Sequence, residues 1–113
     1  MRVITGTARG RVLRTLEGED VRPTTDRVKE AVFSIIQFEI EGRRVLDLFA
    51  GSGQLGIEAL SRGAASATFV DMSKDSLSAV KYNLEHTKLG DNAKALSFYK
   101  AIKDKYPTSL EGY

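Results

Sequence analysis

Two acidic side chains flank a glycine-rich segment in the middle of the chain. The segment reads Gly51-x-Gly53-x-x-Gly56; it follows an apolar run and opens a run with helical spacing. Small residues at such a turn let a ligand approach the backbone and bond to its N–H groups. Asp71 closes the next apolar run, where a carboxylate can accept hydrogen bonds from both hydroxyls of a ribose. A tight turn without a ligand would explain the glycines but not this acid.

Asp47, near the end of the first apolar run, bears on which nucleoside ligand the segment would take. NAD places a pyrophosphate at such a turn, and a nearby carboxylate would repel it. S-adenosylmethionine has no phosphate and carries an ammonium group, which Asp47 could hold directly or through water. The alternative is a buried strand acid whose oxygens accept loop N–H groups. The sequence therefore favours S-adenosylmethionine over NAD as the cofactor.

The residues around this segment predict alternating strands and helices. Residues 44–49 are nearly all apolar, as in a buried parallel strand, and residues 67–71 are rich in β-branched and aromatic types. A short helix is expected over 55–62, and Ser73 can cap a helix that runs to about His86. Strand, helix, strand and helix in this order build a parallel sheet with right-handed crossovers, so the predicted fold class is α/β.

A basic segment is expected at the N-terminus. Residues 2–14 read as a β-hairpin with turn glycines, and residues 1–16 contain no acid. Arginines in such a segment can grip phosphate, or they can serve only to keep an exposed sheet edge soluble. Both interpretations stay open from the residues alone. The arginines concerned are Arg2, Arg9, Arg11 and Arg14.

An amphipathic helix is predicted between this hairpin and the first strand. Pro23 forces the preceding residue out of helical geometry, and the Thr and Asp residues that follow it can cap a helix. The apolar positions then recur at the spacing of one buried helical stripe. That stripe consists of Val28, Ala31, Val32, Ile35 and Ile36.

The tail of the chain has a different pattern. Apolar and aromatic residues from Leu96 to Tyr106 recur at helical spacing, which predicts a helix over 92–106 where a third strand would be expected. Tyr82, Phe98 and Tyr99 are expected in the core. The chain then divides into a basic hairpin with its connector, a nucleoside-binding half-domain and a helical tail, at residues 1–20, 21–91 and 92–113.

Composition excludes several classes of protein. Of the 113 residues, 42% are hydrophobic and 28% are charged, which is ordinary for a soluble domain. Without cysteine there are no disulfides or thiolate metal sites, and a reducing cytoplasm is the simplest location. With His86 as the sole histidine, no metal site is expected. No apolar run is long enough to cross a bilayer, and the N-terminus lacks the apolar segment of a signal peptide.

Taken together, these motifs resemble the bacterial 16S rRNA guanine-N2 methyltransferases, which are class I enzymes that use S-adenosylmethionine. Residues 45–53 have that family's D-x-F-A-G-S-G form of the cofactor motif, and residues 22–31, Arg-Pro-Thr-Thr-Asp-Arg-Val-Lys-Glu-Ala, have its second hallmark. The N-terminal Arg-Val-Ile-x-Gly-x-Ala-Arg-Gly run and residues 56–64 and 69–71 continue the match. The resemblance reaches from Met1 to about Ala93 and implies a partial Rossmann-like class I methyltransferase fold.

The resemblance also implies roles for individual residues. The glycine loop would lie against the methionine part of the cofactor, Asp47 would face its amino group, and Asp71 would accept the ribose hydroxyls. Residues 24 and 25 would close over the methionine end, Met72 would pack near the adenine, and the arginines would hold 16S rRNA or a small-subunit intermediate by its phosphates. The implied cofactor-binding residues are Thr24, Thr25, Asp47, Phe49, Ala50, Gly51, Ser52, Gly53, Asp71 and Met72; the implied RNA-binding residues are Arg2, Arg9, Arg11 and Arg14.

One hallmark of the family has no counterpart in this sequence. An Asp/Asn-Pro-Pro-Tyr/Phe loop holds the guanine amine in the family, but Pro23 and Pro107 are the two prolines here and they are not adjacent. The third-strand acid near the adenine is also missing. No catalytic residue is therefore assigned, and a truncated form that keeps the cofactor-binding half is expected. The strand at 45–49 would have an unpaired apolar edge, so marginal stability and dimerisation are predicted.

Three functions stay open on this evidence. The first is S-adenosylmethionine-dependent methylation of a guanine N2 in 16S rRNA. The second is a non-catalytic remnant that binds the cofactor or RNA. The third is an NAD-binding Rossmann fragment, which Asp47 and the segment 22–26 argue against.

Overall fold

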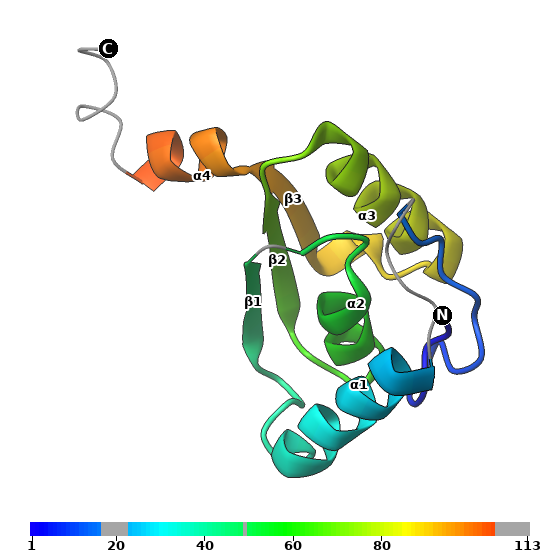
Figure 1. Cartoon of the computed structure of the whole chain (residues 1–113). Coiled ribbons are helices and arrows are strands. Elements are labelled where there is room, and N and C mark those ends of the chain that lie inside the picture. Colours follow the sequence, from blue (N-terminus) through cyan, green and yellow to red (C-terminus); the bar gives the residue numbers. More distant parts are fainter. Residues whose placement is uncertain (17–22, 49, 106–113) are drawn as a thin grey trace.

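The computed structural model describes residues 1–16, 23–48 and 50–105. Its helices and strands alternate along most of the chain (Figure 1). In order they are α1 (Pro23–Ile36), β1 (Arg44–Leu48), α2 (Gln54–Ser61), β2 (Ser66–Asp71), α3 (Lys74–Thr87), a 3-10 turn η1 (Gly90–Asn92), β3 (Ala93–Ser97) and α4 (Phe98–Lys105).

The strands form a three-stranded parallel sheet in the order β1-β2-β3. In its register Leu46 lies beside Thr68, and Phe69 lies beside both Asp47 and Ala95. Figure 1 shows α2, which follows β1, and α3, which follows β2, on the same side of this sheet. The arrangement confirms the predicted α/β fold with parallel strands and helical crossovers.

The predicted helix over 92–106 is wrong in its first half. Residues Ala93–Ser97 form β3, which pairs with β2, and the helix begins only at Phe98. Leu96 fits both the helical spacing and the strand, because over a short run the apolar residues of a half-buried strand can also match a helical spacing. Pairing with β2 is a non-local interaction, which local periodicity does not report. The sheet therefore has a third parallel strand, β3, where the sequence predicts a helix.

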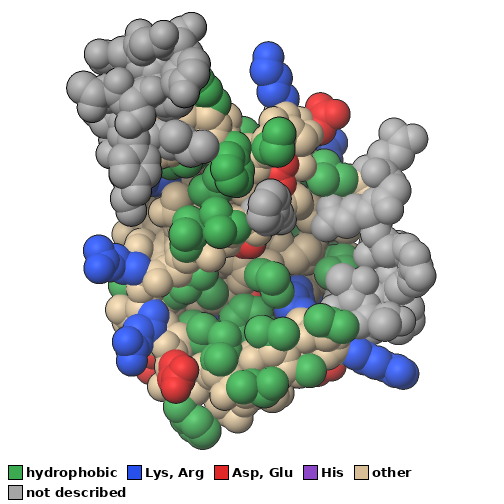
Figure 2. All heavy atoms as spheres, turned by 60° about the vertical axis from the view of Figure 1, so that its left-hand side comes forward, with side chains coloured by type: hydrophobic (Ala, Val, Ile, Leu, Met, Phe, Trp, Pro, Cys, Tyr) green, Lys and Arg blue, Asp and Glu red, His purple; other side chains and the backbone are tan. Residues whose placement is uncertain are grey.

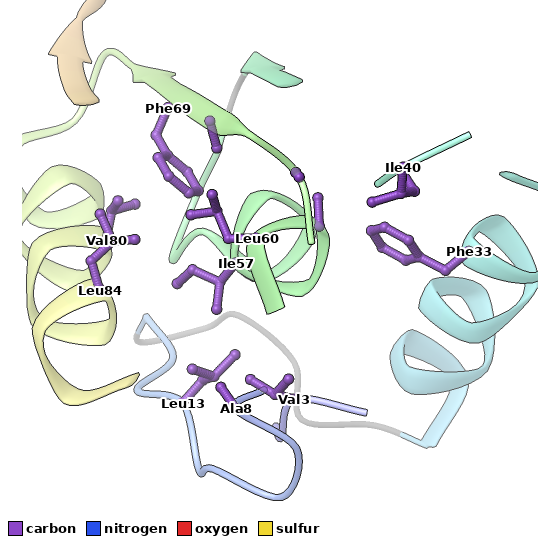
Figure 3. Close-up of a cluster of buried hydrophobic side chains, with 13 residues drawn as sticks. Val3, Ala8, Leu13, Phe33, Ile40, Ile57, Leu60, Phe69, Val80 and Leu84 are labelled. Atoms are coloured by element: carbon purple, nitrogen blue, oxygen red, sulfur yellow. The ribbon is translucent and has the colours of Figure 1, made fainter. Parts of the chain in front are cut away.

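A core between the sheet and its helices fixes the geometry of the glycine segment. Ile57, Phe69 and Val80 are fully buried there, one each from α2, β2 and α3 (Figure 3). Gly56 lets α2 approach β2 closely, since a Cβ atom at this position would lie 2.2 Å from Cε1 of Phe69. The third glycine of the motif therefore serves helix–sheet packing.

The N-terminal segment is held both by its own pairing and by α2. The predicted hairpin is present but short: one antiparallel bridge joins Arg2 and Val12, and the N–H groups of Val3 and Leu13 donate to the carbonyls of Arg11 and Met1 at 3.0 and 2.8 Å. The backbone N–H groups of Ile4 and Thr5 donate to the Glu58 carboxylate, at 2.8 and 3.0 Å. Val3, Ala8 and Leu13 enter the same hydrophobic core as the sheet (Figure 3). The segment thus combines a short hairpin with a second set of hydrogen bonds to side chains of α2.

Helix α1 buries a different face from the one predicted. Val28, Val32 and Ile35 are exposed, whereas Lys29 and Phe33 are buried against the rest of the molecule. On the buried face the Lys29 ammonium pairs with Glu58, a fully buried acid, while Phe33 and Ile36 pack into or against the hydrophobic core. Figure 2 shows the result, a surface on which hydrophobic side chains gather. The exposed apolar side chains over α1, β1 and the start of α2 include Val28, Val32, Ile35, Leu46, Leu48 and Leu55.

Candidate functional site

The glycine loop connects β1 to α2 at the carboxyl ends of the strands, the edge of a parallel sheet at which ligands bind. Gly51 and Gly53 have φ angles of 58° and 86°, in the left-handed region that side chains with a Cβ rarely adopt. The N–H of Ala50 donates to the Val70 carbonyl at 3.0 Å, and the N–H of Gly53 donates to the Ala50 carbonyl at 2.8 Å. The loop is therefore a fixed turn, and α2 starts directly after it.

Asp71 lies against this loop, as the sequence predicts. Its Oδ2 accepts the N–H of Gly51 at 3.0 Å, and its Oδ1 accepts the N–H of Ser73 at 2.9 Å. Desolvation raises the pKa of Asp71, but hydrogen bonds from Ser73, Gly51 and other groups outweigh it, so this pKa lies below its usual range. The side chain is partly exposed and charged at neutral pH. A carboxylate in this state can accept hydroxyl hydrogens from a ligand over the loop.

Asp47 is buried near the end of β1, where it contacts the start of α2. Its Oδ2 accepts the N–H of Gly56 at 3.1 Å. Burial raises the pKa of Asp47 to about 6, while the Gly56 bond lowers it and the charge of Asp71 raises it further. The carboxylate therefore satisfies a backbone N–H, as the alternative interpretation of this residue requires, and it remains mostly ionised at pH 7. A cation such as an ammonium would stabilise its charged form.

A buried ion pair lies next to the loop, and sequence reasoning missed it. Lys29 Nζ lies 3.4 Å from Glu58 Oε1, and both side chains are almost fully buried. Lys29 also donates to Oε1 of Gln54 at 3.5 Å, and Gln54 Nε2 donates to the Ser52 hydroxyl at 3.1 Å. The available signal was a lone acid inside the apolar run of residues 55–60. This network connects α1 to the beginning of α2.

The other predicted cofactor-binding residues lie in varied positions. Ser52 is fully buried and offers no exposed surface to a ligand, whereas Met72 is 77% exposed beside Asp71. Thr24 and Thr25 lie in the first turn of α1, which begins at Pro23, and their side chains are outside the described residues. Phe49 also lies outside them.

The predicted RNA-binding arginines lie on the N-terminal segment. Arg9 and Arg11 are exposed, while Arg2 donates to the Gly10 carbonyl at 3.1 Å. The Arg14 guanidinium lies 4.7 Å from the centre of the Tyr82 ring. Tyr82 and Tyr99 are 46% and 62% exposed, so the prediction that they belong to the core is wrong. An aromatic ring at such a partly exposed position can keep its hydroxyl in water.

Metal-binding clusters and membrane-spanning helices are both missing from the described residues. Among residues 1–16, 23–48 and 50–105 there is no group of three or more His, Cys, Asp or Glu side chains that could hold a metal ion. No described helix combines the length and the apolar character needed to cross a bilayer.

Comparison with known proteins places the chain among methyltransferases. It is 50% identical with YlbH of Bacillus subtilis strain 168 over 93 residues, which cover 82% of this chain and 50% of that protein. It is 42% identical over 106 residues with ribosomal RNA small subunit methyltransferase D of Haemophilus influenzae, covering 88% and 55% of the two chains. The solved structure of yhhF from Escherichia coli matches with a TM-score of 0.76 at 42% identity, and the match covers 86% of this chain and 52% of that one.

The chain thus spans about half the length of the curated relatives that it matches. The family model described as conserved hypothetical protein 95 matches residues 1–109. The match includes both the glycine loop and the N-terminal segment that packs on α2. The chain belongs to this family, whose fold is that of class I methyltransferases and whose relatives include ribosomal RNA small subunit methyltransferase D.

Proposed function

We propose that this chain is the S-adenosylmethionine-binding half of an enzyme that methylates the exocyclic N2 of a guanine in 16S rRNA. The observation that carries the proposal is the glycine loop held between two carboxylates, with Gly51 N–H bonded to Asp71 and Gly56 N–H bonded to Asp47. The names of the relatives support rRNA of the small ribosomal subunit as the substrate class.

The residues present suit S-adenosylmethionine better than a dinucleotide. Asp71 is ionised, and its carboxylate can accept the ribose hydroxyls of either cofactor. The ionised carboxylate of Asp47 favours an ammonium and disfavours a pyrophosphate. When bound, S-adenosylmethionine supplies an electrophilic methyl group on its sulfonium. The chain's own contribution is to bind and orient that group and to exclude water beneath the loop.

The N-terminal segment would supply affinity for the RNA. Arg9 and Arg11 are exposed on a segment that is anchored to α2 through Glu58. Guanidinium groups fixed in this way can bind phosphates bidentately. We expect RNA affinity to fall as the salt concentration rises, and to fall further when both arginines are replaced by alanine.

A second candidate is a non-catalytic protein that binds the cofactor or RNA. Residues 1–113 contain no Asp/Asn-Pro-Pro-Tyr/Phe run, so the two candidates are separated by experiment. Under both candidates the cofactor site is the same, and no residue of the chain is assigned to the methyl-transfer step itself.

Two measurements separate these functions. Calorimetric titration with S-adenosylmethionine and with NAD should give binding that is at least about tenfold tighter for the former, a difference of about 1.4 kcal/mol. Equal affinity, or preference for NAD, would exclude the proposed cofactor. Transfer of tritiated methyl groups to undermethylated small-subunit RNA then distinguishes an enzyme from a binding protein. Methyl incorporation would exclude the second candidate.

A further inference from the structure

Asn83 of α3 connects the glycine loop to the N-terminal segment. Its side chain is fully buried, and its Nδ2 donates to the Ser52 carbonyl at 2.9 Å. The same Nδ2 donates to the Arg14 carbonyl at 2.9 Å, and its Oδ1 accepts the Arg14 N–H at 2.7 Å. One amide group thus bonds to the main chain of two segments that are distant in the sequence.

The bond to Ser52 fixes the orientation of one peptide group in the loop. The Ser52 carbonyl and the Gly53 N–H belong to the same planar peptide unit. The carbonyl accepts from Asn83, and the N–H donates to the Ala50 carbonyl at 2.8 Å. With both ends held, this peptide cannot rotate, and the left-handed φ of 86° at Gly53 is maintained.

The bonds to Arg14 in turn fix Asn83. An amide side chain that both donates to and accepts from one residue's main chain has a defined orientation, which points its NH2 group toward Ser52. Arg14 is held in place because Leu13 is buried and its N–H donates to the Met1 carbonyl at 2.8 Å. The arginine-bearing segment therefore supports the residue that supports the loop.

We propose that Asn83 is a positioning residue for the cofactor loop, held in its working orientation by the main chain of Arg14. The consequence for binding rests on the proposed function, because it requires S-adenosylmethionine to contact the loop. Asn is suited to the position because its amide offers both the acceptor for Arg14 and the donors for Ser52. Asp has the same shape but lacks the donors, and Ala lacks both.

The test compares the full chain carrying Asn83→Asp or Asn83→Ala with the matched control Thr87→Ala. Thr87 lies one turn further along α3, is also buried, and donates to the carbonyls of Asn83 and Leu84 without contacting the loop. Amide hydrogen exchange by NMR, at a temperature where all variants are folded, reports the Gly53 and Arg14 N–H groups separately.

We expect Gly53 exchange to accelerate about tenfold or more in both Asn83 variants and to stay at the wild-type rate in Thr87→Ala. In Asn83→Asp the Arg14 N–H should stay protected, because a carboxylate oxygen still accepts it. The dissociation constant for S-adenosylmethionine should rise about tenfold in both Asn83 variants and remain unchanged in the control.

Unchanged Gly53 exchange in Asn83→Asp would overturn the positioning role. Faster exchange with unaltered cofactor affinity would overturn its relevance to binding. If the wild-type chain binds no S-adenosylmethionine, the proposed function fails, while the exchange rates still decide whether Asn83 holds the loop. If Asn83→Ala does not fold, the isosteric Asn83→Asp tests the positioning role alone, through the exchange rate of the Gly53 N–H and the dissociation constant for S-adenosylmethionine.

Discussion

Replacing Glu58 by Gln tests how much the buried ion pair contributes to the fold. The Glu58 carboxylate is fully buried and accepts from the backbone of Ile4 and Thr5 and from Arg62 Nε at 2.9 Å, and its Oε1 forms an ion pair with the Lys29 ammonium at 3.4 Å. Gln keeps the shape of the side chain but removes the negative charge. Lys29, which is only 2% exposed, would then be a buried cation without a counter-charge.

The expected loss of stability is large for a chain of this size. Removing one partner of a buried pair costs about 3–5 kcal/mol, because the remaining charge stays desolvated. Native domains are stable by only about 5–15 kcal/mol in total, so Glu58→Gln should bring the chain close to unfolding at 25 °C. The loss has two sources, the stranded Lys29 charge and an amide NH2 group that replaces an oxygen accepting from Ile4, or from Thr5 and Arg62, whereas the shape of the side chain and its packing are kept.

A double-mutant cycle in urea at low temperature measures this cost. The single variants Glu58→Gln and Lys29→Met are compared with the double variant, in which no buried charge is stranded. We expect the double variant to recover about 2 kcal/mol or more relative to the sum of the single losses. Additive losses, or a loss below about 1 kcal/mol for Glu58→Gln, would refute the reasoning, since either would mean that the pair is effectively solvated.

Three further predictions concern packing, pH and association. Gly56→Ala should lower the free energy of unfolding by about 1–3 kcal/mol, because the new Cβ would lie 2.2 Å from Phe69 and this clash outweighs the better helix propensity of Ala. Thermal unfolding measures the change, and a gain in stability would show that α2 can shift freely. The pKa of Asp47 is raised to about 6 in the folded chain from 3.8, so its contribution to the free energy of unfolding should fall as pH rises from about 4 to 6. Asp47→Asn should remove this dependence of stability on pH. If the variant keeps the wild-type dependence, other groups are responsible for it. Leu46 and Leu48 are 60% and 51% exposed on β1, which pairs with β2 alone among the described residues. We therefore expect the chain to self-associate through this strand and Leu46→Lys to weaken the association. Sedimentation of the wild type as a clean monomer at high concentration would argue against this.

Local signals in the sequence were sufficient for the central unit of the fold. The apolar run ending at Asp47 and Leu48 became β1, and the glycine loop lies directly after it, where the motif predicts it. Ser73 caps α3 as expected, with its side chain accepting the N–H of Ser76. Asp71 lies against the loop because the ends of neighbouring parallel strands meet at one edge of the sheet. These features depend on residues close in sequence or on a single strand pairing.

Features that depend on distant partners were not predictable in the same way. Strand β3 exists because it pairs with β2, whereas its own residues also fit a helical spacing. The burial of Lys29 requires Glu58 in another helix, so the spacing of apolar residues in α1 could not show which face is buried. Asn83 shows no motif in the sequence, because its partners are main-chain groups of Ser52 and Arg14. A pattern of residue types cannot report contacts made with backbone atoms elsewhere in the chain.

The affinity of the Asp71→Asn variant for S-adenosylmethionine tests the central claim most directly. Calorimetry should compare it with the wild type and with Asp75→Asn, a control that removes an exposed acid from the first turn of α3, the helix that follows Asp71. Loss of a charged acceptor for hydroxyl groups costs about 1.5–3 kcal/mol, so we predict a dissociation constant raised about 10- to 100-fold for Asp71→Asn and unaltered for Asp75→Asn. Wild-type affinity in Asp71→Asn, or an equal loss in both variants, would contradict a cofactor site between the glycine loop and this carboxylate.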